Sequence, residues 1–287
     1  MNAPPLHLTA ASRRWPAELR ELEGSPDELW ARGELDLLAP LPRLAIVGSR
    51  SPTPYGEAQA RRFAHAFAAL GVVVVSGLAR GIDQAAHAAA LAAGGGTIAV
   101  LGSGVDRPWP AGPETDRIAS NGLLLSEFPP GLGPRRHHFP RRNRLISALS
   151  TGVLVVEAAW ASGSLITARW AADQGRGVFA LPGRVDHPMA RGCHRLLREG
   201  ATLIESPEEL LDELGWAAPR PAAAPAPPRP ESGLEAALTG ETLSAEELSH
   251  RTERELTEVL TELVELELAG AVVRAPGGLY RRSQQGG

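Results

Sequence analysis

The sequence predicts an α/β fold, in which an extended Rossmann-like domain with a mostly parallel sheet is followed by a small C-terminal winged-helix domain. Three observations lead to this prediction. Short apolar runs alternate with helical patterns, a stretch rich in proline and alanine interrupts the chain, and the residues after it follow the element order of a winged helix. A length of 287 residues suits one large domain and one small one.

Seven short apolar runs are expected to form buried strands. They cover residues 44–47, 72–75, 98–101, 123–125, 153–156, 178–181 and 202–204. Their apolar residues are continuous rather than alternating, which is typical of parallel strands covered on both faces. Helical patterns follow several of them, for example at residues 56–70, 82–93 and 164–174. Right-handed crossovers then give a doubly wound sheet, which binds ligands beyond the carboxyl ends of its strands.

Composition divides the chain into four parts. Residues 1–40 are expected to form a short helical N-terminal extension, with helices around residues 16–22 and 26–32. Residues 41–216 form the Rossmann-like domain. Residues 217–233 are a Pro/Ala-rich linker that favours extended polyproline conformations.

Residues 234–287 are expected to form the winged helix. Ser244 and Glu247 form a capping-box pattern at the start of its second helix, and the third helix spans residues 253–268. That third helix carries six glutamates against Arg254. Because a helix that binds the major groove needs positive charge, duplex DNA binding is expected to be weak or absent. Arginines on the predicted wing are the basic residues of this domain that could still contact a duplex. A protein-contact or regulatory role is favoured for this domain.

Overall composition is that of an ordinary globular protein, with 43% hydrophobic and 22% charged residues. No apolar run is long enough to cross a membrane, so no membrane partner is expected. The single cysteine, Cys193, excludes a disulfide within the chain and favours a cytoplasmic location. Every basic residue other than histidine is an arginine. GC-rich codon usage explains that bias, although arginine also suits phosphate and base recognition better than lysine does.

Gly/Ser-rich loops follow four of the expected strands. They contain Gly48-Ser49-Arg50, the segment 76–83 with Arg80, Gly102-Ser103-Gly104, and the segment 161–164 with Gly163 and Ser164. Small residues let backbone N–H groups approach an anion at a helix N-terminus. Each loop alone could reflect only a tight turn. Together, at one sheet edge, they favour a ligand that carries phosphate.

Common cofactor and catalytic patterns are missing from the sequence. The first strand lacks the Gly-x-Gly-x-x-Gly pattern of dinucleotide binding, and the absence of lysine excludes a P-loop. Cys193 and His194 lack partner ligands for a metal. The pair Asp83 and His87 is favoured as structural. We therefore expect no cofactor, no metal, no catalytic residue and no enzymatic activity.

The strongest local signal is a basic cluster. Its residues are Arg135, Arg136, His137, His138, Phe139, Pro140, Arg141, Arg142, Asn143 and Arg144. No acidic residue occurs between Glu127 and Glu157. Arginines interleaved with an aromatic ring are what binding of single-stranded nucleic acid requires, since charge contacts the backbone and the ring stacks on bases. The alternative is that Phe139 packs into the core and that residues 141–144 cap a helix.

These motifs resemble the family of DNA-processing protein A (DprA, also called Smf) of bacterial natural transformation. The resemblance covers roughly residues 15–216. It rests on residues 45–50 (AIVGSR), 76–83 (SGLARGID), 139–146 (FPRRNRLI), 157–158 (EA) with 162–168 (SGSLITA), and 178–183 (VFALPG). One departure is the N-terminal region, where about 40 residues replace the family's compact helical domain.

The resemblance implies a non-catalytic homodimer that binds and protects incoming single-stranded DNA and helps to load RecA onto it. It implies phosphate contacts by Arg50 and Arg136 and a base contact by Phe139, and by loose analogy a dimer surface at residues 191–204. The complete expected DNA-binding set is Gly48, Ser49, Arg50, Arg80, Arg135, Arg136, His138, Phe139, Arg141, Arg142, Asn143, Arg144, Gly163 and Ser164.

Two other functions remain open at this stage. One is a nucleotide-processing enzyme, because phosphoribohydrolases of the lysine-decarboxylase-like type use a similar Rossmann variant. Their Pro-Gly-Gly-x-Gly-Thr pattern is not found at residues 161–167. The other is a regulator that reads duplex DNA through the winged helix, which the acidic third helix disfavours.

Overall fold

The computed structural model describes residues 4–216, 233–268 and 270–283. The chain forms two compact units, residues 1–219 and 220–287, which are treated separately below. Most of the expected linker, residues 217–232, lies outside the described residues. In the described part of the chain, no helix is both long and apolar enough to span a membrane.

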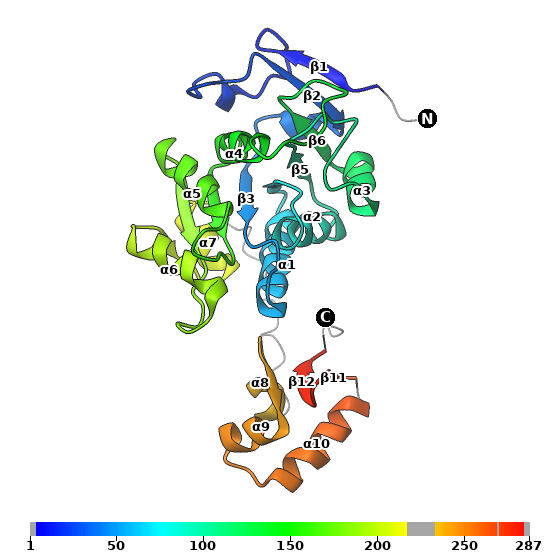
Figure 1. The fold of residues 1–287 in the computed structure, drawn as a ribbon, viewed down its shortest axis with the longest axis vertical. Helices are drawn as coiled ribbons and strands as arrows, with labels where there is room; N and C mark the ends of the chain where they lie inside the picture. Colours follow the sequence, from blue (N-terminus) through cyan, green and yellow to red (C-terminus); the bar gives the residue numbers. More distant parts are fainter. Residues whose placement is uncertain (1–3, 217–232, 269, 284–287) are drawn as a thin grey trace. The chain divides into compact units, whose positions relative to one another are not determined.

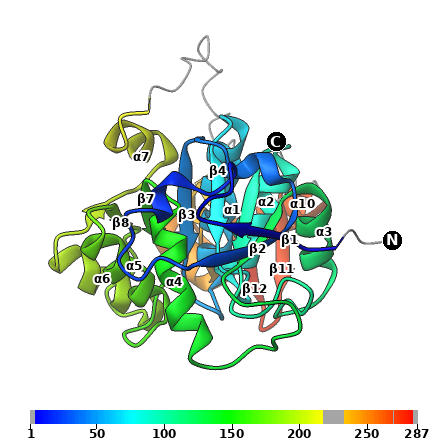
Figure 2. The ribbon, with the colours of Figure 1, turned by 90° about the horizontal axis from the view of Figure 1, so that it is seen from above.

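The first unit is built on a nine-stranded sheet with the order β1-β2-β6-β5-β4-β3-β7-β8-β9. The strands are β1 (Leu6–Thr9), β2 (Glu28–Gly33), β3 (Arg43–Val47), β4 (Val73–Ser76), β5 (Thr97–Val100), β6 (Leu123–Ser126), β7 (Gly152–Val155), β8 (Gly177–Ala180) and β9 (Thr202–Leu203). Strands β3 to β9 are parallel to one another and correspond to the seven expected runs, which confirms the predicted α/β class. Figure 2 shows β3, β4, β7 and β8 side by side.

Helices cover both faces of this sheet. They are α1 (Pro54–Ala69), α2 (Ile82–Ala92), α3 (Pro113–Asn121), α4 (His138–Ala148), α5 (Ser164–Asp173), α6 (Arg191–Arg198) and α7 (Pro207–Glu213). Side chains of α1, α2 and α7 share one apolar core with β3 and β4, and side chains of α4, α5 and α6 share the core on the opposite face. Helices α1 and α2 lie next to each other (Figure 1). The sequence did not predict α3 or α7.

The N-terminal segment is not the helical extension that the sequence predicted. Residues 28–33 form the strand β2, which pairs antiparallel with β6 and with β1 (Figure 1). Leu29 and Ala31 are buried, whereas Glu28 is exposed and Trp30 and Arg32 are only half-buried, a period-two pattern that belongs to a strand. Within residues 4–40, only the short 3-10 turns Ala17–Leu19 and Leu35–Leu38 are helical. The segment thus extends the sheet of the main unit.

Arg43, at the start of β3, ties this N-terminal segment to the sheet. Its side chain is 2% exposed and forms an ion pair with Glu18 at 2.7 Å. It also donates hydrogen bonds to the backbone carbonyls of Leu37 and Ala39. A buried guanidinium is tolerated because these acceptors replace water.

A second buried polar contact lies between α2 and the sheet. The His87 ring is fully buried and its Nδ1 lies 2.7 Å from Oγ1 of Thr97. The Thr97 hydroxyl donates to the carbonyl of Val74, so it accepts a hydrogen bond from the Nδ1–H of His87. Burial, with the nearby charge of Arg142 as a smaller cause, lowers the pKa of His87 to about 3. The folded protein therefore holds this ring neutral.

The second unit has the predicted winged-helix order. Its elements are α8 (Gly233–Ala237), β10 (Thr242–Ser244), α9 (Ala245–Thr252), α10 (Leu256–Leu268), β11 (Val272–Ala275) and β12 (Leu279–Arg282). Ser244 and Glu247 form the expected capping box at the start of α9. Helix α10 begins three residues later than expected, because Glu253 takes a left-handed conformation (φ 54°) at the end of α9. The unit has an apolar core of its own.

Replacing Arg43 with alanine is expected to lower the free energy of unfolding by about 3 kcal/mol, because Glu18 and two carbonyls lose their buried partner. Arg14→Ala is the matched control, since the Arg14 side chain is 53% exposed in its ion pair with Asp36 and should matter by less than about 1 kcal/mol. Urea denaturation of both variants measures the difference. Equal losses of unfolding free energy in the two variants would show that the buried Arg43–Glu18 pair stabilises the protein no more than the exposed pair does.

Replacing His87 with asparagine is expected to make stability less sensitive to acid. The neutral ring stabilises the fold fully above pH 6.5, and this contribution is lost as the pH falls towards 3, because only the unfolded chain takes up the proton in that range. Between pH 7 and pH 5 the wild type should therefore lose about 2 kcal/mol more than His87→Asn. Urea denaturation at both pH values provides the measurement. Parallel losses in the two proteins would show that His87 is protonated in the folded state.

Candidate nucleic-acid interface

A cavity of about 790 Å³ opens at the carboxyl edge of the parallel strands, next to the β3 and β7 loops and the first turns of α4 and α5. Nine of the predicted site residues line it: Gly48, Ser49, Arg50, Arg136, Phe139, Arg142, Asn143, Gly163 and Ser164. The other five do not: Arg80, Arg135, His138, Arg141 and Arg144. The edge expected from the sequence is therefore hollow, and segments more than 100 residues apart meet there.

The loop that carries Arg50 is held by the end of β7. The Ser49 N–H donates to the Glu157 carbonyl at 2.7 Å, and the buried Glu157 carboxylate accepts hydrogen bonds from the N–H and hydroxyl of Thr53. Gly56 is required at the start of α1, because a Cβ there would lie 2.3 Å from that carboxylate. Arg50 thus projects from a loop with a fixed backbone.

The loop after β4 turns around a buried carboxylate. Asp83 accepts hydrogen bonds from the N–H groups of Gly77 and Ala79, at 3.1 and 3.3 Å. Between them Leu78 adopts a positive φ of 59°, which is costly for a leucine and persists because its surroundings fix it. Burial raises the pKa of Asp83 to about 6, and the nearby Arg142 acts in the opposite direction. Asp83 shapes this loop and His87 contacts Thr97, so the two have separate structural roles and do not form the pair that the sequence favoured.

The basic cluster is half loop and half helix. Helix α4 begins at His138, so the second half of the cluster is helical. Arg141, Arg142 and Arg144 therefore follow helical spacing. Arg141 and Arg144 are three residues apart and face the same neighbour, while Arg142 points elsewhere.

Two of the clustered arginines are buried. Arg142 is 3% exposed and donates to the carbonyls of Gly77 and Val100, at the ends of β4 and β5. Burial lowers its pKa to about 10, so it remains charged at neutral pH. Arg144 makes a two-pronged contact with Glu127, at 2.7 and 3.1 Å. These guanidinium groups hold α4 against the sheet.

Glu127, at the edge of the acid-free stretch of the sequence, is a carboxylate partner of the cluster. Its side chain is 1% exposed and pairs with both Arg141 and Arg144. The sequence did not reveal this pairing, because it depends on the contact between the end of β6 and α4 in the folded protein. His138 is also buried, where its ring donates to the Gly102 carbonyl at 3.0 Å and stacks on Phe128.

The sequence left open whether Phe139 packs into the core or stacks on a base, and its position in the structure fits both in part. The ring is half-buried, and one side packs so closely on Gly102 that a Cβ there would lie 2.9 Å from it. The ring also lines the cavity, with the Arg50 guanidinium 5.9 Å from its centre. An aromatic ring held from behind and open in front can accept a stacked base without losing side-chain freedom.

Apart from Arg141, which pairs with Glu127, four arginines around this edge are exposed: Arg50, Arg80, Arg135 and Arg136. Within the described residues, none of them forms an ion pair with a carboxylate. Arg50 and Arg136 line the cavity, whereas Arg80 and Arg135 do not. Unpaired guanidinium groups beside a cavity create a site for a phosphate-bearing chain.

The cavity also includes residues that the predicted set omitted, among them Ser162, Thr167 and Met189. The Ser49 hydroxyl lies 3.5 Å from the Met189 sulfur. Ser162 and Thr167 stand in the motif at residues 162–168, so the sequence carried a signal for them. Met189 follows β8 and had no such signal, since only the folded chain brings it to this edge.

In the second unit, α10 is negatively charged, whereas a helix that binds the major groove of duplex DNA needs positive charge. It carries Glu258, Glu262, Glu265 and Glu267. Arg254, just before it, pairs with Glu262 at 2.6 Å and with Glu258 at 3.7 Å. Its charge is therefore already compensated.

Comparison with known proteins agrees with this architecture. The family model for DNA recombination-mediator protein A matches residues 7–215, and that for the DprA winged-helix domain matches residues 218–278. Protein Smf of Escherichia coli (strain K12) is 43% identical over 98% of this chain and 79% of its own length. The DNA processing protein DprA of Streptococcus pneumoniae is 44% identical over 69% of this chain and 71% of its own length.

Solved structures extend the comparison. An X-ray structure of DprA from Streptococcus pneumoniae is 42% identical, covers 73% of this chain and 74% of its own, and has a TM-score of 0.69. A structure of DprA from Helicobacter pylori, described with its single-stranded DNA binding mode, is 32% identical with a TM-score of 0.66 and covers 75% and 98%. The family of mediators is non-catalytic, which confirms the non-enzymatic expectation. The chain belongs to the DNA recombination-mediator protein A (DprA/Smf) family.

Proposed function

We propose that this protein binds single-stranded DNA in the cavity at the carboxyl edge of its sheet. The observation that carries the proposal is the pair Arg50 and Phe139, an unpaired guanidinium beside a held aromatic ring. The solved structure of the Helicobacter pylori relative is described with the single-stranded DNA binding mode of that protein, which supports the same class of ligand here.

The proposed roles divide the predicted residues into two groups. Those that contact DNA are Gly48, Ser49, Arg50, Arg136, Phe139, Asn143, Gly163 and Ser164, with Arg80 and Arg135 adding positive charge nearby. Those that position the site are His138, Arg141, Arg142 and Arg144, whose side chains are committed to partners inside the protein. Phosphates would contact the arginines, and a base would stack on Phe139.

The finer biological role is part of the same proposal. The protein would protect incoming single-stranded DNA in the cytoplasm and help to load RecA onto it during natural transformation, acting as a homodimer. Family membership supports this role. We propose the surface at residues 191–204 as the dimer contact, because Leu203 is a large apolar side chain that is 42% exposed at the β9 edge of the sheet.

Replacing Arg50 with alanine is expected to weaken poly-dT binding by about tenfold or more, because a charge-assisted hydrogen bond to phosphate can no longer form. The dependence of the binding constant on salt should also become shallower, by about 0.7 for each phosphate that is no longer neutralised. Fluorescence anisotropy over a series of salt concentrations measures both quantities. Phe139→Ala should weaken binding without changing the salt slope, since stacking does not release counterions.

Arg61→Ala is the matched control for Arg50→Ala. It removes the same charge from an exposed position on α1, where Arg61 pairs with Glu57. Affinity and salt slope should stay at the wild-type values. An Arg50 variant that behaved like the Arg61 variant would contradict the proposed site.

A chain that ends at residue 216 is expected to keep the full preference for poly-dT over duplex DNA of equal length. The reason is that α10 is acidic and Arg254 is already paired, so the second unit adds no attraction for a duplex. Competition binding with both DNAs, on the full chain and on the shortened chain, measures the preference. A selective loss of duplex affinity on shortening would show that the winged helix binds DNA.

A further inference from the structure

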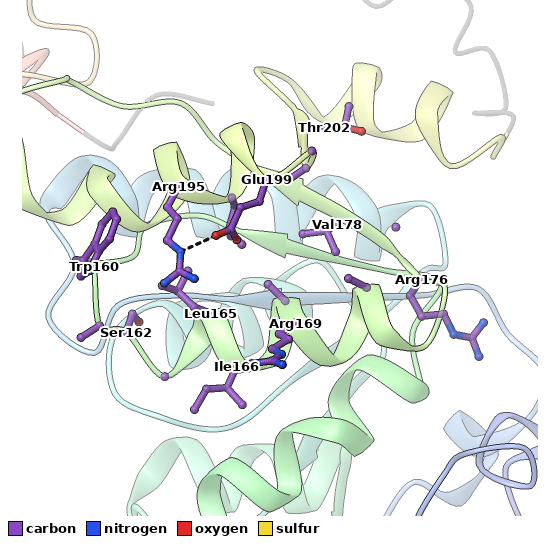
Figure 3. Close-up of a pocket in the computed structure, with 18 residues that line it drawn as sticks. Trp160, Ser162, Leu165, Ile166, Arg169, Arg176, Val178, Arg195, Glu199 and Thr202 are labelled. Atoms are coloured by element: carbon purple, nitrogen blue, oxygen red, sulfur yellow. Dashed lines mark hydrogen bonds and ion pairs between the residues drawn. The ribbon is translucent and has the colours of Figure 1, made fainter.

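Large apolar side chains are exposed in both units of the protein. In the first unit, Trp160 and Ile166 border a groove that also contains Arg195 and Thr202 (Figure 3). The last two residues belong to the surface proposed above as the dimer contact. In the second unit, exposed apolar side chains gather on α10, and the described residues of that unit leave them uncovered.

Four of these side chains lie on one face of α10, because they are spaced four residues apart. They form the α10 stripe, which consists of Leu256, Leu260, Val264 and Leu268, with exposed fractions of 36%, 41%, 54% and 85%. A different face of the helix carries Val259 and Leu263, which are buried in the core of the unit. The core therefore does not account for the stripe. Adjoining apolar side chains that stay exposed mark an interaction surface.

Glutamates accompany the α10 stripe. Glu255, Glu265 and Glu267 are next to its members along the chain, and within the described residues none of the three forms an ion pair. Residues 234–287 as a whole contain 10 glutamates and 5 arginines. The stripe is thus an apolar surface in a negatively charged setting.

This charge decides which occupant fits the stripe. Phosphates of DNA and anionic lipid headgroups would be repelled, and helices that lie on membranes carry lysine or arginine on their polar face. The α10 stripe of a second copy would bring a second set of glutamates to the same contact. A positively charged helix with an apolar face matches both the stripe and the glutamates beside it.

We propose that the α10 stripe is the docking surface for a polypeptide partner, an amphipathic helix rich in lysine or arginine. Apolar side chains of the partner pack on Leu260 and Val264, and its cations pair with Glu265 and Glu267. The third helix of this winged helix thereby contacts protein instead of the major groove. The inference is independent of the proposed DNA cavity, because α10 lies in a separate unit with its own core.

The test measures binding of a labelled helical peptide of leucine and lysine to the full chain by fluorescence anisotropy. Binding should weaken as salt rises, and a peptide with glutamate in place of every lysine should bind at least about tenfold more weakly. Val264→Ser should weaken binding of the lysine peptide about tenfold, because an apolar contact is lost. Leu268→Ser, at a more exposed position of the stripe, should act in the same direction.

Val185→Ser is the matched control. It makes the same replacement at a valine of the first unit that is 89% exposed, and it should leave the affinity for the peptide unchanged. Urea denaturation should be the same for both valine variants, since both side chains are exposed. Equal peptide affinities of the Val264 and Val185 variants, or no preference for lysine over glutamate in the peptide, would overturn the proposal.

Two further measurements separate the other possible occupants. Light scattering of the full chain detects self-association, and flotation with phosphatidylglycerol vesicles detects membrane binding. We expect neither to depend on the α10 stripe. Self-association that Val264→Ser abolishes would overturn the proposal in favour of a second copy, and vesicle binding that it abolishes would overturn it in favour of a membrane.

Discussion

The buried guanidinium of Arg142 is the interaction on which the site depends. It donates to the carbonyl groups at the ends of β4 and β5, and in this way it fixes α4 against the edge of the sheet. Phe139 lies three residues earlier on the same helix and therefore faces the cavity at a set position. A charge this deep is costly, and backbone carbonyls and the nearby Asp83 offset that cost.

The same principle separates arginines that build the site from arginines that can bind a ligand. Arg142 donates to two backbone carbonyls and Arg144 pairs with Glu127, so both buried guanidinium groups are committed to partners inside the protein. Arg50 and Arg136 have no carboxylate partner in the described chain, and they line the cavity. Identical side chains within one short segment thus serve opposite purposes. Burial decides between them, because a desolvated charge must be paired while an exposed one can exchange water for phosphate.

The cavity is formed by several loops that are far apart in the chain. They are the loops after β3 and β7 and the starts of α4 and α5. A parallel sheet places all these loops at one edge, so a ligand that is itself a chain can contact several of them in succession. The acidic α10 belongs to a separate unit with its own core and contributes no comparable surface for DNA.

The sequence by itself determined the parallel strands, the winged-helix order and the edge of the sheet at which the ligand would bind. Continuous apolar runs and capping patterns are local, so they can be read without the fold. The sequence did not predict that residues 28–33 form a strand, nor that Glu127 neutralises Arg141 and Arg144. Only the tertiary structure decided which arginines are buried and that Met189 borders the cavity, because those outcomes depend on contacts between segments far apart in the chain.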